Sequence, residues 1–266
     1  MQDDTLTLER PAAPVKAAAQ ISPAEWELRV QLAAAYRLVD YYGWTEQIYG
    51  HLTARVPGSD NHFLINPWGL NYDEVTASNL VKIDLDGKVI SGDDRKINYA
   101  GFVIHSAIHM TRSAVNHVVM HTHTRAGMAI AAIKEGILPV SMFGTVFHQR
   151  IGYHDYEGAS LYLDERERIV KSLGPHRALI LRNHGLMAVG ETVAECFLRL
   201  YRLERACQVQ LDAAAAGTLN LLSAEVSGRS AADLDSFQGM QSSTEGEVEF
   251  AALMRKLDKI DTSYRQ

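Results

Sequence analysis

The sequence has few cysteines, no excess of positive charge and no long apolar run. Its 266 residues include two cysteines, and 26 basic against 32 acidic side chains give a formal net charge of −6. A mildly acidic chain without a basic cluster is a poor binder of polyanions, which argues against a nucleic-acid partner. Its apolar runs are far shorter than the ~20 residues that a membrane span requires. We therefore predict a globular protein with neither a nucleic-acid nor a membrane partner.

The two cysteines predict a reducing environment. Cys196 and Cys207 share one predicted helix face with Leu200 and Leu203, in the spacing of a buried stripe. Helical rise separates the two thiols by roughly 16 Å, which is too far for a disulfide. Residues 1–22 contain no hydrophobic block and do not resemble a signal peptide. Free, core-packed thiols are typical of reducing compartments, so we expect a cytoplasmic protein.

The spacing of apolar residues predicts helices mixed with short, hairpin-like strands. The predicted strands are 51–56, 63–65, 81–84, 88–90, 117–121, 178–181 and 186–189. The predicted helices are 22–43, 98–112, 124–135, 164–173, 191–216 and 248–260. This pattern favours an α/β domain with a layered sheet.

Histidine is unusually frequent, with 11 copies in the sequence. His121 and His123 end an apolar strand, and residues i and i+2 of a strand point to the same side. His184 follows the strand 178–181, where Gly185 permits a sharp turn. Three neutral imidazoles converging from two strand ends would form a metal site with an open position. A lone His-x-His pair is more often packed or exposed without a metal, so the residues alone leave both interpretations open.

Four segments together resemble the class II aldolase/adducin family over most of residues 24–216. These segments are 105–108, 121–124, 153–158 and 182–186. Their order and spacing agree with the family, and the stretches 62–67 and 101–108 resemble its adducin-like, bacterial-type branch.

The resemblance carries expectations for fold, metal and assembly. It implies a three-layer α/β/α sandwich with a central, largely antiparallel sheet. It also implies a divalent ion on His121, His123 and His184, with Zn²⁺ expected first and Fe²⁺, Mn²⁺ or Co²⁺ as alternatives. A further implication is a homotetramer with its active site between subunits.

Composition, apolar periodicity and this resemblance together predict that the chain divides into four parts. They are a flexible N-terminal arm at 1–21, the aldolase/adducin-like domain at 22–216, a Ser/Gly-rich loop at 217–246, and a C-terminal helix and tail at 247–266.

Some positions depart from the aldolases of the family. Gly101 stands where those enzymes carry a catalytic glutamate, four residues before His105. Tyr99 and Ala100 stand where they carry a serine pair that binds substrate phosphate, and Phe143 aligns with a proton-donating tyrosine. A glycine cannot transfer a proton, and the serine hydroxyls are missing. We therefore predict a substrate without phosphate.

Other polar residues are candidates for the chemistry. His148 and Tyr153 are the predicted catalytic groups, since an imidazole can accept and donate a proton near neutral pH; an exposed loop histidine and a packed tyrosine are the alternatives. The predicted substrate-binding residues are His51, Thr53, Asn66 and Arg125. Arg125 could pair with a carboxylate or simply begin a helix. His105 and His109 lack the intervening acid of a zinc-protease helix, so we expect them to pack or to support the site.

These observations predict a metal-dependent lyase. It would act on a small, non-phosphorylated, carboxylated and potentially aromatic substrate by decarboxylation, retro-aldol cleavage or dehydration through a metal-stabilised enolate. A non-haem Fe(II) oxygenase on the same three histidines is the first alternative. A non-catalytic binding module like the adducin head is the second.

Overall fold

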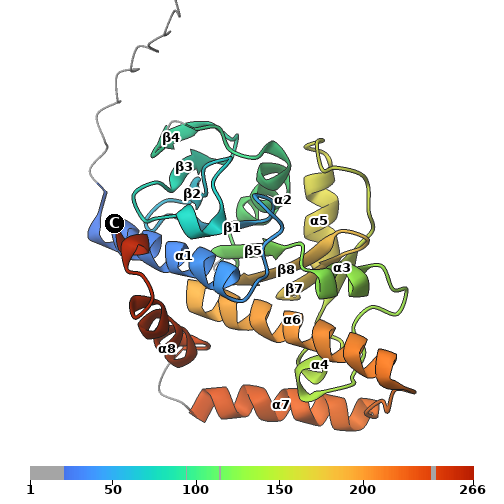
Figure 1. The fold of residues 1–266 in the computed structure, drawn as a ribbon. Helices are drawn as coiled ribbons and strands as arrows, with labels where there is room; N and C mark the ends of the chain where they lie inside the picture. Colours follow the sequence, from blue (N-terminus) through green and yellow to red (C-terminus); the bar gives the residue numbers. More distant parts are fainter. Residues whose placement is uncertain (1–20, 94, 114, 241–243) are drawn as a thin grey trace, which may run out of the picture.

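The computed structural model describes residues 21–93, 95–113, 115–240 and 244–266, and it shows an eight-stranded sheet with helices on both faces (Figure 1). The strand order is β4-β3-β2-β1-β5-β8-β7-β6. Every neighbouring pair is antiparallel except β6 and β7, which are parallel. The predicted three-layer α/β/α sandwich is confirmed. The predicted N-terminal arm lies, except for residue 21, outside the described residues.

The strands are β1 (His51–Arg55), β2 (His62–Ile65), β3 (Val81–Asp84), β4 (Val89–Ser91), β5 (Val118–Thr122), β6 (Gly152–His154), β7 (Ala178–Leu181) and β8 (Gly185–Gly190). The α-helices are α1 (Pro23–Tyr41), α2 (Tyr99–Met110), α3 (Arg125–Ala131), α4 (Met142–Val146), α5 (Glu165–Leu173), α6 (Val193–Ala216), α7 (Ala224–Met240) and α8 (Glu247–Asp258). The described residues also contain the 3₁₀ turns η1 (Tyr72–Glu74) and η2 (Ser263–Arg265). The structure adds β6 and α4 to the predicted elements, and α3 ends earlier than predicted.

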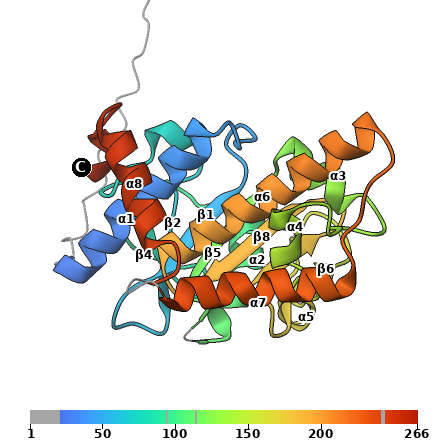
Figure 2. The same cartoon turned by 90° about the horizontal axis from the view of Figure 1, so that it is seen from below.

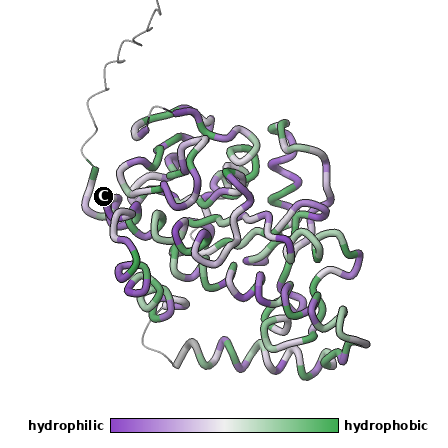
Figure 3. The backbone as a smooth tube through the Cα atoms, in the orientation of Figure 1, coloured by the Kyte–Doolittle hydropathy of each residue, from purple (hydrophilic) through white to green (hydrophobic). Residues whose placement is uncertain are grey.

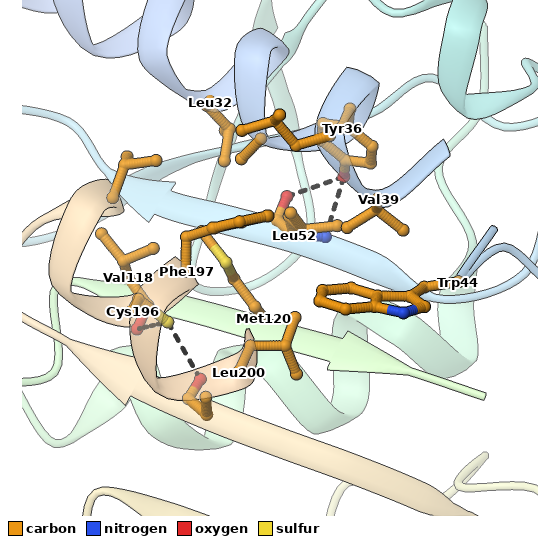
Figure 4. Close-up of a cluster of buried hydrophobic side chains, with 14 of the residues drawn as sticks. Leu32, Tyr36, Val39, Trp44, Leu52, Val118, Met120, Cys196, Phe197 and Leu200 are labelled. Carbon is orange, nitrogen blue, oxygen red and sulfur yellow. Dashed lines mark hydrogen bonds between the residues drawn. The ribbon is translucent and has the colours of Figure 1, made fainter. Parts of the chain in front are cut away.

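One face of the sheet is covered by α1 and α6 and is almost entirely apolar (Figure 4). Leu52 of β1 and Met120 of β5 point toward these helices and pack with Phe197 and Leu200 of α6. The two cysteines lie on α6, buried and free, as predicted. The Cys196 thiol lies 3.2 Å from the Ala188 carbonyl oxygen. This face therefore supplies most of the hydrophobic core.

The other face is covered by α2 and α5 and holds polar side chains as well as apolar ones. Because strand side chains alternate, the neighbours of Leu52 and Met120 point to this side: His51, Thr53 and His121. All three are buried between the sheet and α2. The sheet thus places a layer of histidines beneath α2, and the candidate site is at the end of that layer.

The predicted Ser/Gly-rich loop is wrong for residues 224–240, which form α7. Ser223 begins this helix, its hydroxyl accepting a hydrogen bond from the Val226 amide, and hydrophobic and hydrophilic residues alternate along the helix (Figure 3). The helix packs on α4 and lies below α6 (Figures 1 and 2). The Ser230 and Thr145 hydroxyls are 2.9 Å apart, and Arg150 pairs with Asp235. Its stability therefore depends on tertiary contacts that composition does not reveal.

Among the described residues, no helix is both long and apolar enough to span a membrane.

Candidate metal centre

Three histidines converge where β5 ends and β8 begins. The His121 and His123 Nε2 atoms are 2.7 Å apart, and those of His123 and His184 are 2.9 Å apart. In the part of the chain that the structure describes, these side chains form the one group of at least three His, Cys, Asp or Glu donors close enough to hold a metal ion. The structure therefore brings together the three histidines that the sequence predicts as ligands.

A backbone carbonyl group determines which ring nitrogen of His121, the most buried histidine of the triad, carries the proton. His121 is opposite Met187 in the β5–β8 pairing, and its Nδ1 lies 2.9 Å from the Leu186 carbonyl oxygen. Because a carbonyl oxygen only accepts, Nδ1 carries the proton and Nε2 keeps its lone pair for the site. Burial is the largest of the causes that lower the pKa of His121 well below its usual 6.5, and the neighbouring His123 and His184 lower it further.

A tight turn between β7 and β8 places His184. Asn183 adopts the left-handed conformation with φ of 56°, whereas Gly185, the residue predicted to make the turn, has no positive φ. Gly185 is needed for a different reason. A Cβ atom there would overlap the Thr122 carbonyl oxygen and lie 3.2 Å from Cδ2 of His123. The glycine thus lets the two strand ends approach closely enough for the imidazoles to meet.

The donor set fits a divalent metal ion. Burial lowers the pKa of His184 to about 4, with smaller contributions from His123 and His154, and burial also lowers the pKa of His123. Neutral imidazoles are the form that coordinates metals. Lone pairs held this close repel one another unless a proton or a cation lies between them. Three imidazole nitrogens without a further protein ligand form a site with an open position.

A second set of histidines lies beneath α2, behind the triad. The Thr53 hydroxyl is 2.8 Å from His105 Nδ1 and 2.8 Å from His109 Nε2. The remaining ring nitrogens, His105 Nε2 and His109 Nδ1, are buried without a partner among the described residues. Burial lowers the pKa of His109 to about 3 and that of His105 well below 6.5. The packing role predicted for the two histidines agrees with this arrangement, whereas the Thr53 hydroxyl is engaged within the protein rather than presented to a substrate.

His51 and Asn66 form a contact of their own. His51 Nδ1 is 2.9 Å from Asn66 Oδ1, and the Tyr36 hydroxyl lies 2.8 Å from the same oxygen and 2.7 Å from the Leu52 carbonyl oxygen. Burial lowers the pKa of His51 to about 4, while the bond to Asn66 opposes the shift. A Cβ atom at Gly101 would overlap the His51 ring. The structure therefore gives Asn66 the role of orienting His51, a role that the sequence did not predict.

The other predicted residues lie at different distances from this centre. Tyr153 is half-buried on β6, where its hydroxyl accepts the Ile137 amide at 3.2 Å and its ring lies under the Arg182 guanidinium. His148 follows α4 and does not belong to the group of close donors around the triad. Arg125 is exposed at the start of α3 and forms no hydrogen bond or ion pair with the described residues. Within one chain, none of the three forms a hydrogen bond, ion pair or ring contact with a triad histidine.

A small cleft beside His184 contains residues that the sequence did not assign to the site. Its volume is about 10 Å³, and His154, Tyr156 and Glu165 are among its lining residues. The Tyr156 ring centroid is 6.2 Å from that of His184, and half of the tyrosine is exposed. His154 Nε2 lies 3.5 Å from a Glu165 carboxylate oxygen. The aromatic segment at 153–158 was the available signal for His154 and Tyr156, because it begins on β6, which pairs with β7 beside the turn that carries His184.

Comparison with known proteins places this geometry in a family. The sequence profile described as "Class II Aldolase and Adducin N-terminal domain" matches residues 30–211. A crystal structure of an aldolase II superfamily protein from Pseudomonas syringae is 46% identical, with a TM-score of 0.87 over 93% of this chain and 98% of that one. An L-fuculose 1-phosphate aldolase from Glaciozyma antarctica is 28% identical, with a TM-score of 0.81 over 94% of this chain and 96% of that one.

An adducin is similar as well. Rat alpha-adducin is 43% identical over 88% of this chain, although the match covers 33% of the longer adducin. The profile and these relatives agree with one another and with the histidine geometry. The chain belongs to the class II aldolase and adducin family.

Proposed function

We propose that this protein is a metal-dependent lyase that acts on a small, non-phosphorylated, carboxylated substrate. The observation that carries the proposal is the convergence of His121, His123 and His184, whose Nε2 atoms lie within 4.8 Å of one another. Zn²⁺ is the first expected ion, because it accepts three imidazoles and leaves an open position. When bound, the ion would supply Lewis-acid chemistry at a carbonyl oxygen. Decarboxylation, retro-aldol cleavage and dehydration all need this stabilisation of negative charge.

Residues of the chain would support the substrate around that ion. Arg125, exposed and without a partner among the described residues, is the proposed partner of the substrate carboxylate. The exposed ring of Tyr156 beside His184 offers a surface for an aromatic substrate. The position that the resemblance assigns to a catalytic glutamate is Gly101, which supports a reaction other than the standard sugar-phosphate cleavage.

We extend the proposal to a homotetramer with its active site between subunits. The triad is at a strand end rather than in a closed cavity, since His123 and His184 are only partly buried. His148 and Tyr153, the proposed catalytic groups, form no contact with the triad within one chain. A neighbouring subunit could bring such groups to it, and the tetramer is tested by light scattering on the purified protein.

Elemental analysis of the purified protein tests the metal assignment. We expect about one divalent ion per chain in the wild type, and loss of most of it in His121→Ala and in His184→Ala. His62→Ala is the matched control, because His62 lies on β2 and its Nδ1 bonds Ser59 instead of the site. Full metal content in both triad variants would rule out the assignment.

The oxygenase alternative is favoured by the same donor set, because three imidazoles with open positions also suit Fe(II) chemistry. Assays of the Zn²⁺-loaded and Fe²⁺-loaded protein, each with and without oxygen, separate the two functions. A lyase turns over with Zn²⁺ in the absence of oxygen. Activity that requires both iron and oxygen would favour the oxygenase.

The binding-module alternative is favoured by the 43% identity to rat alpha-adducin. Turnover of a panel of hydroxy- and keto-acids distinguishes it from the lyase. We expect activity that is lost on chelation and restored by added metal. A protein that folds, holds its metal and converts no member of the panel would support the binding module.

A further inference from the structure

His51 lies beside the histidine triad without belonging to it. In the β1–β5 pairing His51 is directly opposite His121, and both rings lie about 6 Å from the ring of His105 under α2, at 6.1 and 6.3 Å between centroids. Among the described residues, the close group of donor atoms contains the triad and excludes His51. His51 is therefore a separate group at the edge of the metal centre rather than a fourth ligand.

Hydrogen bonds fix which nitrogen of His51 carries the proton. Nδ1 is 2.9 Å from Asn66 Oδ1, and the single proton of the Tyr36 hydroxyl is shared between that oxygen, at 2.8 Å, and the Leu52 carbonyl oxygen, at 2.7 Å. The Asn66 amide nitrogen lies 3.5 Å from the Pro67 carbonyl oxygen, which agrees with this orientation of the amide. Because an amide oxygen only accepts, Nδ1 donates, and Nε2 keeps a lone pair with no partner among the described residues.

The first turn of α2 holds the other side of the ring. A Cβ atom at Gly101 would overlap Cδ2 of His51 and lie 2.6 Å from its Nε2. Any side chain at this position would therefore displace the imidazole. The Asn98 side chain caps this turn, accepting from the Gly101 amide at 3.3 Å. Asn66 and Gly101 together leave the imidazole one orientation.

We propose that Nε2 of His51 accepts a hydrogen bond from a hydroxyl or N–H group of the substrate held at the triad. The proposal rests on the proposed function, and it narrows the substrate class. A lone pair attracts a group that carries a hydrogen and repels a carboxylate or phosphate oxygen. The substrate therefore presents a hydroxyl to β1, as a hydroxy acid would, and its carboxylate is bound elsewhere. This contact with a hydroxyl makes the substrate-binding role predicted for His51 from the sequence more specific.

A double-mutant cycle tests the fixed orientation without substrate or metal. Gly101→Ala should lower the melting temperature of the metal-free protein by about 5 °C, because the new methyl group overlaps the His51 ring. In a His51→Ala background the same substitution should cost nothing. Gly228→Ala is the matched control, since a Cβ atom there meets open space. An equal loss in both backgrounds would contradict the packing of His51 against Gly101.

A pair of chelating probes tests the acceptor. Acetohydroxamate and N-methylacetohydroxamate bind a divalent ion through the same two oxygens, but only the first retains an N–H donor. The affinities of the two probes for the Co²⁺-loaded wild type are first corrected for their affinities for free Co²⁺. After this correction, acetohydroxamate should bind roughly 5- to 10-fold more tightly than N-methylacetohydroxamate, which is the range of one hydrogen bond.

Two variants then show whether the preference for acetohydroxamate comes from a hydrogen bond to His51 or from the smaller size of this probe. His51→Asn keeps a donor for Asn66 but is too short to place an acceptor at the position of Nε2, whereas His51→Phe keeps a ring there without an acceptor. Both should hold Co²⁺ normally and lose the preference between the probes. A preference that persists in His51→Phe would overturn the proposal. A wild type that takes up no Co²⁺ would refute the proposed function instead, and the double-mutant cycle would still decide the orientation of His51.

Discussion

The two faces of the central sheet are built from the same strands and are filled in opposite ways. Toward α1 and α6, Leu52 and Met120 lie in a continuous apolar core. Toward α2, their neighbours His51 and His121 lie in a layer of buried imidazoles with depressed pKa values. One face contributes to stability by removing apolar surface from water. The other face buries polar groups, which lowers stability unless they are paired. This face holds the candidate functional site.

The largest changes in stability and metal content should come from truncating the adjacent β5 residues Met120 and His121. Met120→Ala leaves a cavity in the apolar core and should lower the free energy of unfolding by about 2–5 kcal/mol, while the folded fraction keeps its metal. His121→Ala should lose most of the metal, because it removes one of three ligands. Urea denaturation and elemental analysis measure the two effects. Metal loss in Met120→Ala with metal retained in His121→Ala would break the distinction between the faces.

The next largest loss of stability and metal affinity should come from a substitution at the strand ends that meet at the triad. Gly185→Ala forces a methyl group against the Thr122 carbonyl oxygen and the His123 ring. We expect a loss of about 1–3 kcal/mol in the free energy of unfolding, together with weaker metal binding. Gly217→Ala, where an added Cβ atom meets nothing within 4 Å, should do neither. Unchanged metal affinity in Gly185→Ala would show that the triad tolerates strand separation.

The buried imidazoles should make the polar face sensitive to acid. His109 has its pKa lowered by burial to about 3 in the folded chain, against about 6.5 when unfolded. Between these values the unfolded chain binds a proton that the folded chain does not, so stability falls as the pH falls. One such histidine contributes about 1.4 kcal/mol per pH unit to that slope, and nothing above pH 7.

Substitution of the same residue isolates its contribution. His109→Leu should remove about this amount from the slope of unfolding free energy against pH, measured by urea denaturation between pH 6 and 4. Gly217→Ala, which changes no titratable group, should leave the slope intact. Parallel curves for wild type and His109→Leu would show that His109 does not titrate on unfolding.

The smallest effect should come from the turn before β8. Asn183 has a φ of 56°, and a residue with a Cβ atom but no local hydrogen-bonding side chain is disfavoured there. Asn183→Ala should cost about 1 kcal/mol, whereas Asn183→Gly should be close to neutral. Thermal unfolding of the two variants provides the measurement, and a neutral Asn183→Ala would show that the turn is held by its tertiary contacts alone.

The triad was predictable because its signals are local. His121 and His123 share a side by strand alternation, and His184 follows an apolar strand with a turn. The resemblance to the aldolase and adducin family linked the two segments. Most strands and helices could be predicted for the same reason, since apolar periodicity is a property of short windows.

The supporting contacts could not be predicted in this way. His51 meets His121 only through the β1–β5 register, and Asn66 reaches His51 from the end of β2. Thr53 looked like a polar group available to substrate, but α2 covers it and places His105 and His109 on its hydroxyl. Helix α7 is likewise decided by its packing on α4. Each of these depends on pairings between distant parts of the chain.

The pairing of β5 between β1 and β8 has a consequence for how the protein folds. Both partners of β5 are remote from it in sequence, so two long loops must close before His121 meets its neighbours. We therefore expect the ligands to assemble late along the folding pathway, and a metal ion to act mainly by slowing the unfolding of the assembled sheet.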